Sequence, residues 1–204
     1  MPATLSAFVK SIGVWQEAQG QVGLLHAIVL AMPARVLVYC RKSVADVSAE
    51  MLVYELRGAD LETLAEALDL PEGEDAAVEE MWTRFRVEPA TGPINGLEIH
   101  WHERQRPIQV SCGPPLDGEI EETLEDLPSS SDEPGAARVR EHLSGTREIV
   151  EFEMGIDGSH HLAATISEVL AFYLAERGEG IVWFYHREFA LPEDRGARLW
   201  RSGD

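Results

Sequence analysis

Residues 148–185 read EIVEFEMGIDGSHHLAATISEVLAFYLAERGEGIVWFY, and this stretch decides the fold class. Apolar residues alternate with polar ones over residues 148–156, which is typical of a strand with one buried face. A helical stripe follows, made of Leu162, Ile166, Val169, Leu170 and Tyr173. Gly178 and Gly180 end this helix, and residues 181–185 are apolar on both faces, as in a central strand. The stretch therefore predicts a C-terminal βαβ unit with parallel strands and a right-handed crossover.

The rest of the chain predicts further elements around this unit. Strands are expected over residues 35–41 and 51–56, and the alternation over residues 97–112 predicts a β-hairpin. Helices are expected over residues 12–32, 61–68, 75–86, 118–127 and 136–143. Residues 128–135 read PSSSDEPG, which is typical of a surface loop. Together these elements predict one α+β domain over residues 1–204, with a mixed sheet of about five or six strands covered by helices.

The charge of the chain is its most unusual property. The sequence has 17 Lys and Arg against 36 Asp and Glu, for a net charge of −19. Residues 59–135 contain 4 of the basic and 20 of the acidic residues, so this middle segment carries −16. A surface this acidic repels phosphates, which argues against a nucleic-acid-binding protein. The asymmetry favours a one-sided acidic surface that attracts a basic partner.

Cysteine usage and the apolar segments bear on the cellular compartment. Two cysteines, Cys40 and Cys112, are too few for a secreted disulfide framework and are expected to be buried thiols. The first twenty residues carry charges where a signal peptide needs an apolar core. The apolar run over residues 22–40 contains Arg35, which is costly inside a bilayer, so no membrane span is expected. We expect a cytoplasmic protein, and the preference for Arg over Lys favours a GC-rich bacterial genome as its source.

One histidine pair is the best candidate for metal chemistry. The sequence has no GxxxxGK[ST], GxGxxG, GxSxG, HExxH or CxxC motif. Alternate residues of a strand share a face, so His100 and His102 are expected to lie beside Glu98, where they could bind a metal ion. His160 and His161 are candidates for a further ligand. The simpler interpretation is that both strand histidines are solvated on the polar face, and no cofactor is predicted.

A nucleophilic site is a weaker hypothesis. Cys112 could act as a nucleophile with His100 or His102 as its base. Strand alternation opposes this arrangement because it places the cysteine on the apolar face and the histidines on the polar face. No catalytic residue is therefore predicted, and a metal- or histidine-dependent enzyme centred on His100 and His102 is kept as an alternative function.

The acidic segments form the candidate interaction surface. Glu119, Glu122 and Asp126 fall on one side of the helix expected over residues 118–127, opposite its apolar stripe. A second acidic patch lies near the helix expected over residues 75–86, and aromatic residues at a patch edge could anchor a partner. The predicted partner-binding residues are Glu72, Glu74, Asp75, Glu79, Glu80, Glu119, Glu122, Asp126, Trp82 and Trp101.

These features favour a non-enzymatic, acidic protein-binding module. An inhibitor or immunity-type protein that neutralises a basic protein, such as a toxin, has these properties, because opposite charge speeds association and suppresses wrong partners. Neither nucleic acid nor a membrane is expected as a partner. A further alternative is a structural subunit of a homo-oligomer whose acidic surface keeps it in solution.

Overall fold

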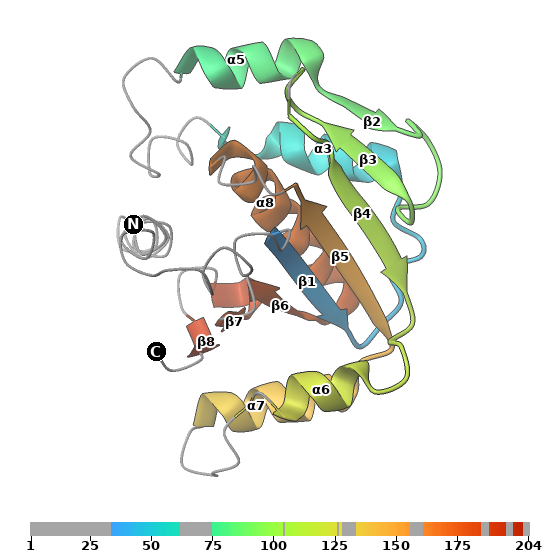
Figure 1. Ribbon diagram of the computed structural model, residues 1–204, viewed down its shortest axis with the longest axis vertical. Coiled ribbons are helices and arrows are strands. Elements are labelled where there is room, and N and C mark those ends of the chain that lie inside the picture. The colour runs from blue at the N-terminus through green and yellow to red at the C-terminus, as the bar shows by residue number, and fades with distance from the viewer. Residues whose placement is uncertain are drawn as a thin grey trace, which may run out of the picture.

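One eight-stranded sheet forms the frame of the computed structural model, which describes residues 34–61, 75–103, 105–125, 127, 134–155, 161–184, 188–194 and 198–201 (Figure 1). The strand order is β2-β3-β4-β5-β1-β6-β7-β8. The strands are β1 Ala34–Cys40, β2 Arg86–Glu88, β3 Leu97–His100, β4 Ile108–Gly113, β5 Glu148–Met154, β6 Ile181–Phe184, β7 Glu188–Ala190 and β8 Arg198–Arg201. The helices are α3 Ala49–Gly58, α5 Asp75–Arg84, α6 Glu119–Glu125, α7 Pro134–Leu143 and α8 His161–Gly178, with a 3-10 turn at Pro192–Asp194.

The predicted α+β class is confirmed, but two details of the sheet were wrong. The sheet has eight strands rather than five or six, because β2, β7 and β8 are only three or four residues long and lack a repeating pattern. Every strand pair in the described part of the chain is antiparallel, so the sheet is not mixed.

The position of β1 explains the antiparallel pairing. β1 pairs antiparallel with both β5 and β6, so β5 and β6 run parallel to each other, as the predicted βαβ unit requires. They are not neighbours, however, because β1 lies between them and fills the gap that α8 crosses (Figure 1). The unit is therefore a split βαβ, in which an early strand inserts between two late ones.

The larger core lies between the sheet and the helices α3 and α8. The predicted stripe of α8 is confirmed, since Leu162, Ile166, Val169 and Leu170 are buried and Tyr173 is partly buried against the same core. α8 packs on β1, β5 and β6, and it also contacts α3. Removing this many aliphatic side chains from water is the main force that holds α8 on the sheet.

A smaller core lies on the opposite face of the sheet. Tyr39 of β1, Trp183 of β6 and Phe189 of β7 are buried there beneath residues of α7, including Val139 and Leu143. α6 and α7 lie side by side at one end of the molecule (Figure 1). The described helices leave the outer strands β2, β3 and β4 uncovered on this face, so polar side chains can lie there in contact with solvent.

Residues 51–56 form part of a helix, and the predicted strand there was wrong. The side chain of Ser48 caps α3 by accepting a hydrogen bond from the backbone N–H of Met51. Leu52 and Leu56 are buried, whereas Tyr54 is 81% exposed. Strand alternation would place all three on one face. The run MLVYEL is short enough to fit both the helical and the strand period. The Ser48 cap and the observed burial pattern show that it is helical.

The other predicted elements correspond closely to the described ones. The hairpin is confirmed, with Leu97 opposite Val110 and Ile99 opposite Ile108. The helices predicted over residues 75–86, 118–127 and 136–143 are α5, α6 and α7, and α5 ends earlier because residues 86–88 pair with β3 instead. The predicted helix over residues 12–32 lies outside the described residues, as do most of the helix over residues 61–68 and the loop over residues 128–135. None of the described helices has the length and apolar character needed to cross a membrane.

Candidate functional site

A row of polar side chains crosses the half of the sheet that the described helices leave open. Glu88 of β2 is opposite Glu98 of β3, which is opposite Gln109 of β4. The row continues through Glu153 of β5 to Arg35 of β1. Five adjacent strands thus each contribute one polar residue at the same level. Residues directly opposite on neighbouring strands have Cβ atoms about 5 Å apart, so these side chains can interact in sequence.

Strand alternation places this row on the solvent side. Leu97 and Ile99 point into the larger core, so Glu98 and His100 point to the opposite face. In the same way Ile108 and Val110 are buried while Gln109 is exposed. The apolar half of each strand therefore fixes the register of the polar half, because a slip by one residue would bury the carboxylates.

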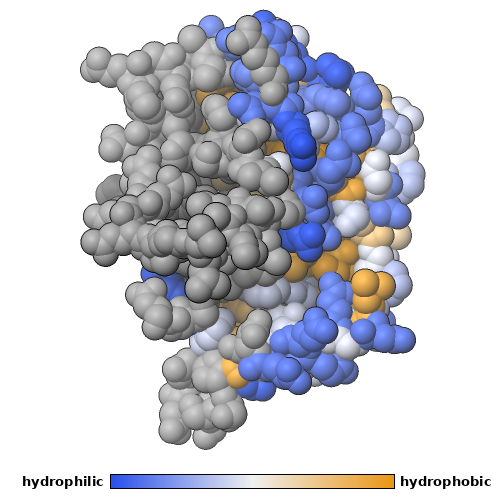
Figure 2. Space-filling view, viewed as in Figure 1, coloured by the Kyte–Doolittle hydropathy of each residue, from blue (hydrophilic) through white to orange (hydrophobic). Residues whose placement is uncertain are grey.

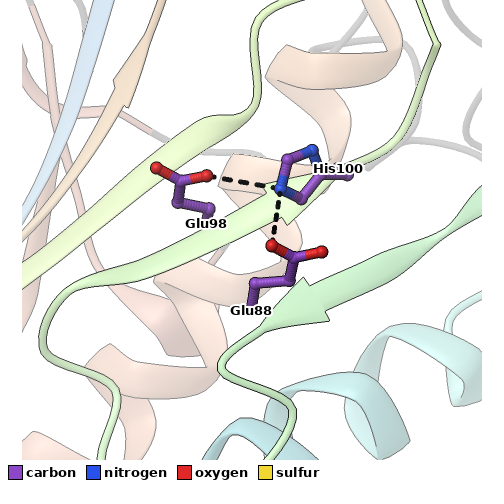
Figure 3. A group of neighbouring side chains, drawn as sticks. All are labelled: Glu88, Glu98 and His100. Carbon is purple, nitrogen blue, oxygen red and sulfur yellow. Dashed lines mark ion pairs between the residues drawn. The ribbon is translucent and has the colours of Figure 1, made fainter.

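Three potential metal ligands converge at the β2–β3 end of the row (Figure 3). The Nε2 atom of His100 lies 3.3 Å from Oε2 of Glu98 and 3.8 Å from Oε2 of Glu88. These three atoms all lie within 4.8 Å of one another. The side chain of His100 is 19% exposed, and its Nε2 atom is buried and makes no hydrogen bond to any residue that the structure describes. We call Glu88, Glu98 and His100 the carboxylate–histidine cluster.

Outer hydrogen bonds orient both carboxylates of the cluster. Oε1 of Glu88 accepts a hydrogen bond of 2.8 Å from Nε of Arg86, and Oε1 of Glu98 accepts one of 3.1 Å from Nε2 of Gln109. Each carboxylate therefore uses one oxygen for a neighbour and directs the other towards His100. Such outer partners fix the direction of ligand atoms in metal sites.

At the other end of the row, Arg35 binds two carboxylates of β5. Its Nε lies 3.0 Å from Oε1 of Glu151, and its Nη2 donates to Oε2 of Glu153 at 3.2 Å. Partial burial raises the pKa of Glu151; the guanidinium of Arg35 lowers it, and the carboxylates of Glu153 and Glu119 raise it. The net effect is a raised pKa, so a group at this position holds its proton more tightly than a solvated glutamic acid does.

The structure brings together only part of the predicted histidine site. His100 and Glu98 are neighbours, as strand alternation predicts, but the cluster does not include His102. β3 ends at His100, and the ring of His102 lies 5.7 Å from that of Trp101. His160 lies outside the described residues, and His161 begins α8, with its side chain outside the described part.

Glu88, Gln109 and Arg86 were missed as members of the site. Glu88 lies in a three-residue strand that no periodicity can reveal, and the sequence pattern extended the preceding helix to residue 86. The Arg86-Val87-Glu88 alternation, with only Val87 buried, is the one local signal that could have found it.

The hypothesis that pairs Cys112 with a histidine does not fit the register. The backbone N–H of Cys112 donates to the side chain of Asn95, so Cys112 lies level with residue 95. His100 is five residues further along β3, or about 16 Å at the usual rise of a strand. Burial raises the pKa of the Cys112 thiol to about 12, with Glu148 adding to the shift. A thiol with this pKa is a poor nucleophile at neutral pH.

The two predicted acidic patches lie at opposite ends of the molecule. α5, with exposed Glu79 and Glu80, is at one end of the long axis, and α6, with exposed Glu122, is at the other (Figure 1). Glu119 is half-buried, and its Oε2 accepts a hydrogen bond of 2.8 Å from the backbone N–H of Leu116. The chain therefore does not combine the two patches into one surface. Glu72, Glu74 and Asp126 lie outside the described residues, as does the side chain of Asp75.

The two predicted aromatic anchors are largely covered. Trp101 is 3% exposed and belongs to the larger core, which leaves little ring surface for a partner. Trp82 is half-buried, with its ring 5.2 Å from that of Phe85 and the guanidinium of Arg57 5.5 Å above it. Strand alternation placed Trp101 correctly on the apolar face, and that face is the interior.

The exposed acids of α6 differ from Glu80 of α5 in their ion pairing. On α5, Glu80 forms an ion pair of 3.0 Å with Arg84. On α6, Glu121, Glu122 and Glu125 are exposed and form no ion pair with any residue in the described ranges. Figure 2 shows a hydrophilic surface over α6. Directly before this helix, Leu116 is 76% exposed, one of two large apolar side chains so exposed among the described residues. We call Leu116, Glu121, Glu122 and Glu125 the α6 patch.

Comparison with known proteins finds no counterpart for this arrangement: no protein-family model matches the chain, and neither the curated proteins nor the solved structures include a significant match.

Proposed function

We propose that this chain is a non-enzymatic protein-binding module that holds a basic protein on the α6 patch. The observation that carries the proposal is the set of exposed carboxylates on α6 that form no ion pair with any described residue, together with the exposed side chain of Leu116 three residues before the helix. An inhibitor or immunity-type protein that neutralises a basic partner, such as a toxin, is the class of protein that fits this surface.

Electrostatics supports a basic partner. Like charges on neighbouring helix turns repel and weaken the fold by a few tenths of a kcal/mol per pair. The chain as a whole carries −19, so these carboxylates also lie in a negative long-range field. A cationic protein that neutralises them relieves the repulsion and is drawn in by the same field, which raises its association rate.

The underlying structure holds α6 in a fixed position. The hydroxyl of Tyr39 in β1 lies 3.3 Å from that of Thr123, and the Thr123 hydroxyl donates to the backbone oxygen of Glu119. Ile120 and Leu124 pack against the smaller core. A patch presented on a rigid helix costs less ordering entropy on binding than one on a loose segment. The exposed Leu116 supplies the apolar contact that charge alone does not give.

The opposite positions of α5 and α6 allow a charge-matched test. Wild-type protein, E121Q/E122Q and E79Q/E80Q are immobilised, and proteins retained from native lysate are identified by mass spectrometry. We expect wild type and E79Q/E80Q to retain the same basic protein and E121Q/E122Q to lose it. For the purified partner, the association rate should fall at least about tenfold from low to moderate salt. Equal retention by all three baits, or a rate independent of salt, contradicts the proposal.

Two further measurements address the inhibitor class and the oligomer alternative. An inhibitor suppresses the activity of its partner at one equivalent, and E121Q/E122Q should need a larger excess to do so. Sedimentation of the free chain at several concentrations tests the homo-oligomer. A concentration-dependent dimer formed through the α6 patch would mean that a second copy of the chain, rather than a different basic protein, binds this surface.

A further inference from the structure

The carboxylate–histidine cluster has the geometry of a metal site. Zinc binds imidazole nitrogen and carboxylate oxygen at about 2.0–2.1 Å, so two donors on a tetrahedral ion lie about 3.3 Å apart. The Nε2 atom of His100 is 3.3 Å from Oε2 of Glu98 and 3.8 Å from Oε2 of Glu88 (Figure 3). The three ligand atoms all lie within 4.8 Å of one another, so modest side-chain rotations would place one ion in contact with all of them.

Three features distinguish the cluster from an ordinary group of surface acids. The donor set includes an imidazole nitrogen that is buried and has no hydrogen-bond partner among the residues that the structure describes. Both carboxylates are held from outside by Arg86 and Gln109, which leaves their inner oxygens directed at His100. The strand register sets Glu88 directly opposite Glu98, which is unfavourable for two negative charges unless a cation lies between them.

We propose that Glu88, Glu98 and His100 bind one divalent transition-metal ion of the Zn²⁺ class. Imidazole suits zinc and its transition-metal neighbours, whereas magnesium and calcium prefer sites made of oxygen alone. Both carboxylates are about half exposed, so water can reach the ion and complete its coordination. The site lies on the open face of the sheet, away from the α6 patch, and does not depend on the proposed partner.

The test is calorimetric titration of ZnCl₂ into tag-free protein from which metals have been removed with EDTA. We expect one zinc ion per chain. H100Q and E98Q should each weaken zinc binding at least tenfold. H102Q removes a histidine two residues away that is not in the cluster, and it should leave the affinity unchanged. MgCl₂ in place of ZnCl₂ should bind at least tenfold more weakly than ZnCl₂.

The ring nitrogens of the histidines provide a test in the wild-type protein, independent of how the variants fold. Long-range ¹H–¹⁵N spectra should show the Nε2 resonance of His100 shifting on addition of one equivalent of ZnCl₂, with that of His102 unmoved. No zinc binding by the wild type, equal weakening by H100Q and H102Q, equal affinity for magnesium, or a shift at His102 alone would overturn the assignment.

Discussion

Glu88 and Glu98 lie directly opposite each other on β2 and β3, and the inner oxygen of each carboxylate points at the same nitrogen of His100. Arg86 and Gln109 hold the outer oxygens. The two carboxylates therefore concentrate negative charge around one ring nitrogen of His100, near the edge of the sheet. A cation bound there would join two strands, of which β2 is only three residues long.

Zinc should therefore stabilise the folded protein. At a free zinc concentration about 100 times the dissociation constant, linkage predicts a gain of about 2.7 kcal/mol. For a chain of this size this is a rise of roughly 5–10 °C in Tm, measurable by differential scanning calorimetry. E88Q should show a much smaller rise, and E79Q, a charge-matched change on α5, should behave as wild type. A rise of equal size in E88Q would show that zinc binds elsewhere.

The raised pKa of Glu151 predicts a specific pH dependence of stability. Burial keeps its proton bound in the folded state above the ordinary carboxyl pKa of 4.5, so the folded state binds more protons than the unfolded state. The free energy of unfolding must then fall as pH rises from the unfolded pKa through the folded pKa, and stay level above it. Urea denaturation between pH 4 and 7 should show this fall in wild type and a smaller fall in E151Q.

E153Q is the control for the pH experiment because Arg35 binds both carboxylates. Glu153 is more exposed than Glu151. E153Q should retain most of the fall in stability. If E153Q flattens the pH profile as much as E151Q, the effect comes from losing a partner of Arg35 rather than from the burial of Glu151.

The helical assignment of residues 49–58 predicts unequal costs for two neighbouring substitutions. Leu52 is 1% exposed, so L52A should lower the free energy of unfolding by about 2–5 kcal/mol. Tyr54 is on the outer side of α3, so Y54A should change it by no more than about 0.5 kcal/mol. Chemical denaturation measures both. Similar large costs would indicate the strand that the sequence pattern suggests, in which the two side chains share a face.

Two glycines at helix ends should respond oppositely to alanine. A Cβ at Gly178, the last residue of α8, would lie 2.5 Å from the Sγ atom of Cys40, so G178A should destabilise the protein by about 1–3 kcal/mol. A Cβ at Gly58, the last residue of α3, meets nothing within 4 Å, so G58A should be neutral or stabilising by up to about 1 kcal/mol. Thermal unfolding of both variants is the measurement. Similar effects of the two would contradict the close packing of α8 against β1.

The parts of the fold that the sequence predicts are those with several repeats of one period. The stripe of α8 and the alternation of β3 and β4 are long enough to identify the element and its buried face. The run over residues 51–56 has six residues and fits either period; the Ser48 cap and the exposure of Tyr54 between buried Leu52 and Leu56 show that it is helical. The three-residue strands β2 and β7 are formed by pairing with neighbours distant in sequence, which local patterns do not encode.

For the carboxylate–histidine cluster, the sequence likewise predicts the part that depends on one strand and not the part that depends on pairing between strands. Alternation within β3 placed Glu98 and His100 on one face, and that prediction concerns a single strand. Glu88 and Gln109 join them through the registers of β2 and β4, which the sequence alone does not fix. His102 failed as a ligand because β3 ends two residues before it. The acidic surface was predicted from composition, but the separation of α5 from α6 is a property of the tertiary structure.

The insertion of β1 between β5 and β6 has a consequence for biosynthesis. Val38 pairs with Val150, 112 residues later, and Val36 pairs with Phe184, 148 residues later. A nascent chain emerging from the ribosome therefore carries its central strand unpaired until residues 148–184 have been translated. Contacts this distant in sequence are slow to form, so β1 joins the sheet late. Among the described strands, residues 34–40 therefore wait longest during translation for a pairing partner, so this apolar run is the strand most exposed to pairing with another chain.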